Sequence, residues 1–364
     1  MEVERLILAL NCGSSSLKFG VYRAAEAGDP DLLCEGEAEE IGRPNGSFWF
    51  RQGEAKDEQR IESANHGEAL AHALAFLDKQ GFKRFWKAGH RVVHGGPEVR
   101  EHRELTAGVL EKLQAAVPFA PLHLPASLEV IAAMKGRTPE LRQVVCLDTA
   151  FHSGMPDVAR TFALPAAVRQ KGVERYGFHG LSLESILAQL ERVPGKLVVA
   201  HLGNGASITA IRDGRSVDTT MGLTPTGGVM MGTRCGDLDP GVVVFLARHG
   251  FAQADELEDL VNRRSGLLGV SGVSSDVRQL TEARAKPEAD LALRMFCYQV
   301  RKAIAAMAAA LGGMELLVFT GGIGEHAEEL RTEICEPLRW MGGFETRVLP
   351  AREDLQIARI AVRL

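Results

Sequence analysis

The feature that most constrains the fold is a strand–turn–strand unit that occurs twice along the chain. The first copy covers Leu6–Tyr22, where two apolar runs flank a turn of small polar residues at 11–16. The second covers Leu197–Ile211, with a similar turn at 202–207. Each copy has the pattern of a β-hairpin. The repeat predicts two related lobes rather than two unrelated domains.

The length and the remaining apolar patterns agree with two α/β lobes. A chain of 364 residues suits about two domains. Residues 23–60 are polar and turn-rich. Helical spacing of apolar residues is found at 66–80, 107–117, 127–135 and 288–311, and strand-like runs at 144–147 and 316–320. Strands that alternate with helices predict an α/β fold with largely buried sheets.

Composition excludes several function classes. Lys and Arg total 42 and Asp and Glu total 47, so the formal net charge is −5. This balance provides no positive field for non-specific nucleic-acid binding, although a local cluster of cations can still bind an anion. The start at residues 1–5 is charged, and no apolar run reaches the roughly 18 residues of a membrane span. Six scattered cysteines without a CxxC motif indicate a reduced, cytosolic protein.

Three glycine-rich turns are candidate ligand sites. Gly13–Ser16, followed by Lys18, and Gly203–Ser207 have the composition of a phosphate cradle, although each is also compatible with a plain hairpin turn. Gly322-Ile323-Gly324 fits GxGxxA, but its late position argues against a Rossmann fingerprint. We interpret it as a glycine turn that a base or ribose can approach closely.

The polar candidates each have two interpretations. His90 and His94 are spaced as zinc ligands on a helix, but the surrounding residues indicate a strand and a turn. Asp148 follows an apolar strand and can be interpreted as a turn carboxylate or as a ligand-binding group at a sheet edge. Arg234 lies between glycines and can be interpreted as a solvated charge or as a cation held near an anion.

Longer motifs resemble those of one known family, the acetate kinases (acetate/propionate kinase family). The similar segments are NCGSSSLK at 11–18, GHRVVHGG at 89–96, LDTAFH at 147–152, RYGFHG at 175–180, HLGNGAS at 201–207, MGLTP at 221–225, MGTRCGDLDP at 231–240, SGLLGVSG at 265–272 and FTGGIGE at 319–325. They occur in the family's order along nearly the whole chain.

The resemblance implies an α/β fold of two duplicated lobes of the actin/hexokinase/Hsp70 (ribonuclease H-like) type, with an active-site cleft. It implies an N-terminal lobe at 1–149, joined by the tail 353–364, and a C-terminal lobe at 150–352. The implied reaction is reversible transfer between ATP and acetate, giving ADP and acetyl phosphate. The implied cofactor is Mg²⁺, with Mn²⁺ as a substitute, and the implied assembly is a cytoplasmic homodimer.

The resemblance also implies the site residues. The implied catalytic residues are Asp148, Arg91, Arg234, His179 and His123. Those for the acyl group are Val93, Leu122, Phe178 and Pro225, beside Arg91. Those for nucleotide and phosphate are Asn11, Ser14, Ser16, Lys18, His201, Asn204, Gly205, Asp276, Arg278, Gly322, Ile323 and Gly324. Those for the metal are Asn11, Asp148 and Glu353.

The sequence departs from the family pattern at several points. Leu124 replaces a polar residue beside His123, Leu181 and Leu183 replace polar residues after His179, and Thr226-Gly227 alters the acyl-pocket segment. Propionate or butyrate as the preferred acid, and a nucleotide-binding module without catalysis, therefore remain alternatives. A zinc hydrolase is a further alternative.

Overall fold

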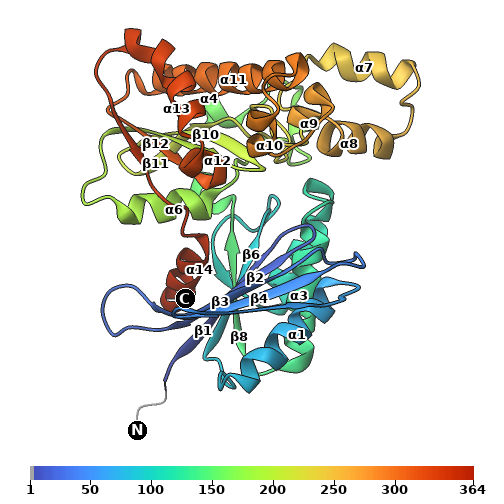
Figure 1. Ribbon diagram of the computed structural model, residues 1–364, viewed down its shortest axis with the longest axis vertical. Helices are drawn as coiled ribbons and strands as arrows, with labels where there is room; N and C mark the ends of the chain where they lie inside the picture. Colours follow the sequence, from blue (N-terminus) through green and yellow to red (C-terminus); the bar gives the residue numbers. More distant parts are fainter. Residues whose placement is uncertain (1–3) are drawn as a thin grey trace. The chain divides into compact units, whose positions relative to one another are not determined.

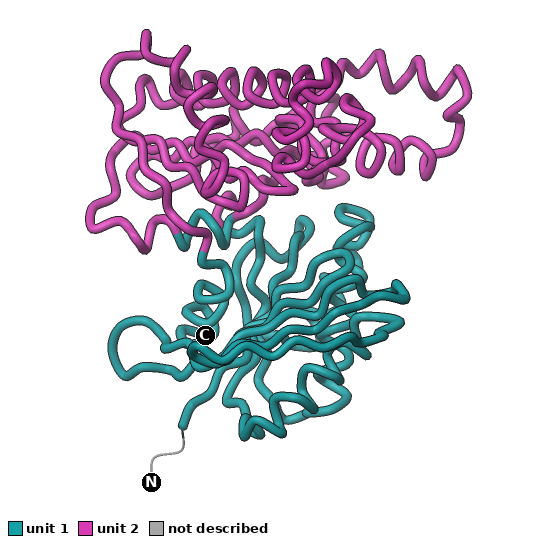
Figure 2. Tube along the Cα trace, in the orientation of Figure 1, with its two compact units in different colours: residues 1–150, 180–185, 352–364 teal, residues 151–179, 186–351 magenta. Residues whose placement is uncertain are grey.

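The chain folds into two compact units (Figure 2). The computed structural model describes residues 4–364, and residues 1–3 of the charged start lie outside the described part. Unit 1 contains the chain up to Ala150 together with Gly180–Ser185 and Arg352–Leu364. Unit 2 contains Phe151–His179 and Ile186–Ala351.

Unit 1 is built on an eight-stranded sheet with the order β5-β4-β3-β2-β1-β6-β8-β7 (Figure 1). Its strands are β1 (Leu6–Cys12), β2 (Leu17–Arg23), β3 (Asp31–Glu39), β4 (Ser47–Gln52), β5 (Ala55–Arg60), β6 (Lys87–Val92), β7 (Arg103–Glu104) and β8 (Arg142–Leu147). The predicted hairpin is confirmed, since β1 and β2 pair antiparallel. Residues 23–60, which the sequence showed only as polar and turn-rich, contain the whole of strands β3, β4 and β5.

Helices cover both faces of this sheet. They are α1 (His66–Lys79), α2 (Ala107–Ala115), α3 (Leu124–Arg137) and α14 (Glu353–Arg363), with the short η1 (Val117–Phe119). Alternate side chains of a strand point to opposite faces. Leu8 and Leu10 accordingly pack in the cluster that includes α1 and α3, whereas Ile7 and Ala9 pack with α14. The central strand β1 is therefore buried on both sides.

Unit 2 is built on a five-stranded sheet with the order β11-β10-β9-β12-β13. Its strands are β9 (Lys196–Leu202), β10 (Ala206–Arg212), β11 (Arg215–Thr219), β12 (Leu316–Thr320) and β13 (Glu345–Val348). The predicted second hairpin is confirmed by the antiparallel pairing of β9 with β10. The 25-residue helix α11 (Pro287–Leu311) packs on β9, β10 and β11.

The remaining helices are shorter. They are α4 (Asp157–Arg160), α5 (Ala166–Arg169), α6 (Gly180–Gln189), α7 (Pro240–Arg248), α8 (Ala254–Arg263), α9 (Gly266–Ser271), α10 (Val277–Glu282), α12 (Gly321–His326) and α13 (Glu328–Cys335), with η2 (Ala150–His152) and η3 (Glu336–Met341). The predicted glycine turn at 322–324 is wrong, because these residues form the first turn of α12 directly after β12.

The same five-strand pattern is present in both units, which confirms the predicted duplication. In unit 1, β3-β2-β1 is an antiparallel meander and β1-β6-β8 is parallel. In unit 2, β11-β10-β9 and β9-β12-β13 repeat this arrangement. The two hairpins recognised in the sequence therefore occupy equivalent places in two related sheets.

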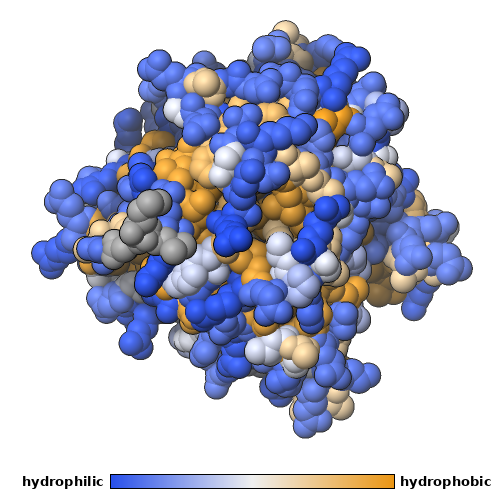
Figure 3. All heavy atoms as spheres, turned by 90° about the horizontal axis from the view of Figure 1, so that it is seen from below, coloured by the Kyte–Doolittle hydropathy of each residue, from blue (hydrophilic) through white to orange (hydrophobic). Residues whose placement is uncertain are grey.

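The face of the molecule drawn in Figure 3 is mostly hydrophilic, with polar and charged residues around smaller apolar areas. Within residues 4–364, no helix combines the length and the apolar character needed to cross a membrane. All six cysteines carry free thiols.

Candidate active site

The centre of the candidate site in unit 1 is an ion pair between Arg91, on β6, and Asp148, directly after β8. These strands are parallel neighbours, so their carboxyl ends meet at one edge of the sheet. Arg91 Nε and Nη2 donate to Asp148 Oδ2 at 3.0 and 2.7 Å, and Arg91 Nη1 donates to Asn11 Oδ1 at 2.9 Å. The planar guanidinium is thus fixed by two strands and the end of β1.

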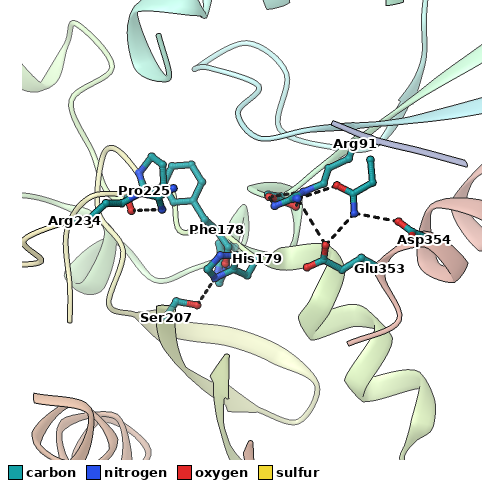
Figure 4. Close-up of polar contacts among 11 residues, drawn as sticks. Arg91, Phe178, His179, Ser207, Pro225, Arg234, Glu353 and Asp354 are labelled. Carbon is teal, nitrogen blue, oxygen red and sulfur yellow. Dashed lines mark hydrogen bonds and ion pairs between the residues drawn. The ribbon is translucent and has the colours of Figure 1, made fainter. Parts of the chain in front are cut away.

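Two acidic residues of helix α14 complete this group (Figure 4). Glu353 Oε2 lies 3.7 Å from Arg91 Nη1 and accepts from Asn11 Nδ2 at 3.3 Å. Asn11 Nδ2 also donates to Asp354 Oδ1 at 3.0 Å. The predicted residues Asn11, Arg91, Asp148 and Glu353 therefore lie together. Asp354 also belongs to this group. The sequence analysis missed it, because its only signal in the sequence is that it follows Glu353.

Burial shifts the pKa values of the ionisable side chains in this group. Removal from water raises the pKa of the Asp148 carboxyl above its ordinary value, and the adjacent Arg91 charge opposes this. Burial also raises the pKa of Asp354, against the hydrogen bond from Asn11. Burial alone would lower the pKa of Arg91, but Asp148 and Glu353 raise it, so Arg91 stays charged. Burial therefore works against the charged forms of Asp148 and Asp354, and the Arg91 charge works in their favour.

The first glycine-rich turn lies beside this group. Gly13 N–H donates to the Ser16 carbonyl at 2.9 Å, which closes the turn between β1 and β2. Ser14 and Lys18 are exposed, and Ser16 is half-buried. Lys18 Nζ lies 4.0 Å from the Glu37 carboxylate. The turn therefore presents a hydroxyl and a cation to solvent, as the phosphate-cradle interpretation requires.

The predicted acyl-pocket residues of unit 1 have different surroundings. Val93, just beyond β6, is buried, and Leu122 is half-buried. His123 is the N-cap residue of α3, so its position is fixed by the start of that helix. The neighbouring departure, Leu124, is fully buried in a cluster with Ile131 and Leu147. It is a core residue rather than a group facing a ligand.

In unit 2, His179 and Arg234 are the principal candidate groups. His179 is the N-cap of α6 and has a φ of 61°, in the left-handed region that is uncommon for residues other than glycine. Its Nδ1 is hydrogen-bonded to Ser207 Oγ at 2.9 Å, and its ring stacks on His201 with centroids 4.0 Å apart. Arg234 Nη1 donates to the Pro225 carbonyl at 3.2 Å (Figure 4).

Gly205 shows that these two groups face one space. A Cβ atom placed on Gly205 would lie 3.2 Å from His179 Nε2 and 3.3 Å from Arg234 Nη1. The absence of a side chain lets the imidazole and the guanidinium approach the Gly205 backbone closely, so two nitrogen groups converge on this turn. Both groups can donate hydrogen bonds to the oxygens of a phosphoryl group.

The second glycine-rich turn also lies close to α12 and to the loop that carries Arg234. Gly203 packs near Gly322 N and His201 Nε2, each 3.9 Å from its Cβ position. Gly232 N–H donates to the Asn204 carbonyl at 3.4 Å. The structure therefore brings His201, Asn204 and the start of α12 together around one turn.

The remaining predicted residues are placed as follows. Asp276 caps α10 by accepting from Arg278 N–H at 2.8 Å, and the Arg278 guanidinium is exposed and paired with the Asp276 carboxylate. Phe178 and Pro225 are buried. Ile323 and Gly324 follow Gly322 in α12.

Comparison with known proteins identifies the family. The model of the acetokinase family matches residues 6–352. An acetate kinase of Rhodopseudomonas palustris (strain TIE-1) is 44% identical over 391 aligned positions, covering 99% of this chain and 98% of the relative. The chain belongs to the acetokinase family. The resemblance recognised in the sequence motifs is thereby confirmed.

Solved structures of related proteins have the same fold as this chain. The crystal structure of Porphyromonas gingivalis acetate kinase has a TM-score of 0.86 at 35% identity, covering 99% of both chains. That of a propionate kinase from Francisella tularensis has a TM-score of 0.91 at 34% identity, covering 99% of this chain and 100% of the other.

The other departures of this chain from the family pattern are mostly core residues. Leu181 and Leu183 are fully buried, and Leu181 packs with Ile357 of α14. Thr226 Oγ1 donates to Asn262 Oδ1 at 2.5 Å. The first two departures therefore exchange polar groups for packing in unit 1.

Proposed function

We propose that this protein transfers the γ-phosphoryl group of ATP to acetate, giving ADP and acetyl phosphate, and catalyses the reverse reaction. The observation that carries the proposal is the close approach of His179 Nε2 and Arg234 Nη1 to the Cβ position of Gly205. Membership of the family and the names of its relatives support acetate as the acceptor.

The chemistry needs charge neutralisation more than proton transfer. A carboxyl group with a pKa near about 4 is already ionised at neutral pH, so its oxygen attacks phosphorus without a general base. The bond from the γ-phosphorus to the ADP oxygen breaks as the new P–O bond forms. Two like charges about 4 Å apart repel by roughly 4 kcal/mol at an effective dielectric constant near 20. Arg91 and Arg234 offset this repulsion, and His179 donates to an oxygen of the transferring group.

The described residues fit a magnesium ion. No three His, Cys, Asp or Glu side chains of residues 4–364 are placed as ligands of one metal ion. Mg²⁺ usually takes one or two carboxylates, substrate phosphates and several waters, so a complete protein cage is unnecessary. We propose that Asn11, Asp148 and Glu353 hold the ion, directly or through water. When bound, it neutralises charge on the phosphates, and Mn²⁺ has the charge to replace it.

Acyl hydroxamate formation tests the proposal. Purified protein with Mg-ATP, acetate and hydroxylamine is expected to give acetohydroxamate at a rate proportional to enzyme. Absence of product with acetate, propionate and butyrate would refute the assignment. Nucleotide binding in calorimetry without turnover would instead support a binding module of the same fold.

Propionate is the second candidate acceptor, because the Francisella propionate kinase structure superposes with a TM-score of 0.91. The ratio of kcat/KM values for acetate, propionate and butyrate decides between them. Acetate is expected to have the highest value.

We also propose a homodimer, which forms through helix α7. Its residues Val242, Val243, Val244 and Phe245 are 39–59% exposed, although they are consecutive and apolar. A helix that is apolar on all sides is normally buried, and exposed apolar patches mark interaction surfaces. A second copy of the chain is the partner that the commonest symmetric assembly supplies.

Light scattering after gel filtration tests this assembly. The wild-type mass is expected to be twice the 39.4 kDa of one chain. Phe245→Asp is expected to give monomer, whereas Val158→Asp, at another exposed apolar residue, is expected to leave the dimer intact. A wild-type monomer, or a dimer in both variants, would exclude α7 as the interface.

We propose the cytoplasm as the compartment. The proposed reaction consumes ATP, and the six free cysteines suit a compartment where thiols remain reduced. The proposed partners are small molecules, without nucleic acid or membrane.

A further inference from the structure

Outside the residues of the proposed reaction, a polar network in unit 1 ends at Leu147, the residue before Asp148. Leu147 N–H donates to His102 Nδ1 at 3.0 Å. His102 Nε2 lies 2.9 Å from Glu184 Oε1, and Glu184 Oε2 accepts from Gln356 Nε2 at 2.7 Å. The network joins the residue before β7, the end of β8, the first turns of α6 and helix α14.

The backbone donor determines the tautomer of His102. A peptide N–H can only donate, so Nδ1 of His102 must carry the lone pair. The proton is then on Nε2, which donates to the Glu184 carboxylate. The His102 and Glu184 side chains are only 11% and 20% exposed, so water competes little for these bonds. Glu184 thus selects the tautomer that Leu147 requires.

Backbone hydrogen bonds hold Asp148 on two sides, next to this network. Asp148 N–H donates to the Val92 carbonyl at 3.1 Å, and its carbonyl accepts from Gly180 N–H at 2.8 Å. Gly180 and Glu184 are four residues apart on α6 and so lie on one face of the helix. The helix therefore contacts the end of β8 twice, once directly and once through His102.

We propose that His102, held as its Nε2–H tautomer by Glu184, is a positioning residue that fixes the Leu147–Asp148 end of β8. Through the Asp148 carboxylate it fixes the orientation of the Arg91 guanidinium. The structural part of this inference stands alone, and only its kinetic consequence depends on the proposed function. Small displacements of a catalytic group cost up to about 100-fold in rate, which sets the scale of the effect.

Substitutions at His102 separate its hydrogen bond with Leu147 N–H from its hydrogen bond with Glu184. His102→Ala removes both and is expected to lower kcat about 10-fold or more, with the KM for ATP changed less than about twofold. His102→Asn provides an oxygen on a short side chain that can accept from Leu147 N–H. It is expected to recover kcat to within about threefold of wild type.

Exchanging the side chains at positions 184 and 356 tests the bonds that Glu184 accepts. Glu184→Gln places an amide NH₂ group against either His102 Nε2–H or Gln356 Nε2, so two donors face each other and one hydrogen bond is lost. The double variant Glu184→Gln/Gln356→Glu restores one acceptor for each donor and is expected to regain most of the lost kcat. Glu104→Gln is the matched control, because Glu104 joins β7 to β8 through Arg142 at the far end of the same strand. Its kcat is expected to stay at the wild-type value.

Two readouts do not depend on activity. Nitrogen-15 NMR of histidine-labelled wild type is expected to show His102 with a proton on Nε2 and none on Nδ1. Hydrogen exchange of the Leu147 amide is expected to accelerate in His102→Ala and to stay slow in His102→Asn.

The outcomes distinguish this inference from the proposed function. A wild-type protein without kinase activity would remove the proposed function, while the tautomer and the Leu147 amide would still decide the role of His102. A proton on Nδ1, or His102→Ala with wild-type kcat and Leu147 protection, would overturn the inference. If His102→Ala does not fold, the tautomer and the Glu184 exchange give the answer.

Discussion

At position 205, the absence of a side chain lets His179 and Arg234 approach the backbone closely. The backbone conformation there is open to any residue, so Gly205→Ala tests the space alone. The new methyl group would lie 3.2 Å from His179 Nε2 and 3.3 Å from Arg234 Nη1. We expect kcat/KM for ATP to fall about 10- to 100-fold with little loss of stability. Gly154→Ala, where a Cβ meets nothing within 4 Å, is the control.

Arg234 is predicted to be the more sensitive residue. Its guanidinium is the cation beside Gly205, and arginines that stabilise a transferring phosphoryl group contribute about 10³-fold or more to kcat. Arg234→Ala is expected to lose turnover by about this factor while its circular dichroism spectrum stays unchanged. Arg169→Ala, at an exposed residue of unit 2, should keep full activity. Near-normal turnover of Arg234→Ala would contradict the assigned role.

Because His90 is buried, we predict that the free energy of unfolding depends on pH. Burial lowers the pKa of His90 to about 4, from an ordinary value near about 6.5. Between these values the unfolded chain binds a proton that the folded chain does not, so stability falls as the pH decreases from about 6.5 to 4. The full effect is about 3 kcal/mol. Urea titrations should give His90→Asn a flatter pH profile than wild type. Parallel profiles would show that His90 does not contribute.

The candidate site was predictable only where the signal is local in sequence. The turns with Asn11 and Gly205 follow from their composition, and Arg91 and Asp148 follow from motifs. The pair His102–Glu184 could not be found in this way, because its partners are 82 residues apart and neither lies in a motif. Asp354 was missed for a similar reason, since its contact with Asn11 exists only after α14 packs on β1.

Among the elements, helix α14 connects packing to the candidate site. It packs on β6 through Gly89, whose Cβ position is 2.5 Å from Ile357 Cγ2, and its first residue is Glu353. Gly89→Ala is therefore expected to displace α14 and to destabilise the protein by about 1–3 kcal/mol. Ile357→Ala alone is expected to cost about 2–5 kcal/mol.

The double variant Gly89→Ala/Ile357→Ala distinguishes displacement from simple loss of packing. The new methyl group occupies part of the space that Ile357 leaves, so the double variant should be less destabilised than the sum of the single variants. Urea unfolding gives the three free energies. Additive values would show that Gly89 does not determine the position of α14.

The elements that the sequence predicted well are those with one dominant pattern. Both hairpins and helices α1 and α11 show clear apolar periodicity and were predicted close to their observed bounds. Strands β3, β4 and β5 were missed because they lie toward one edge of the sheet. β5 is polar and almost wholly exposed. Its pairing with β4 supplies the strand conformation that its side chains do not indicate.

For the whole molecule, we expect the net charge of −5 to have little influence on the capture of the proposed anionic substrates. Fields between exposed charges are screened beyond about 8–10 Å at physiological salt, whereas the roles proposed for Arg91 and Arg234 require contact distance. Replacing Lys56 and Lys83 by Gln makes the net charge more negative by two. Their side chains are 57% and 69% exposed, and they lie outside the candidate site.

We therefore expect kcat/KM for acetate and for ATP to change less than about twofold in the double variant at 0.15 M salt. The single substitution Arg234→Ala alters the net charge by one and should lower the same quantity by about 10³-fold. Measuring both variants from 0.02 to 0.3 M KCl separates the two effects. A steep salt dependence of the Lys56→Gln/Lys83→Gln variant would show that long-range steering by the whole protein, rather than local arginines, governs substrate capture.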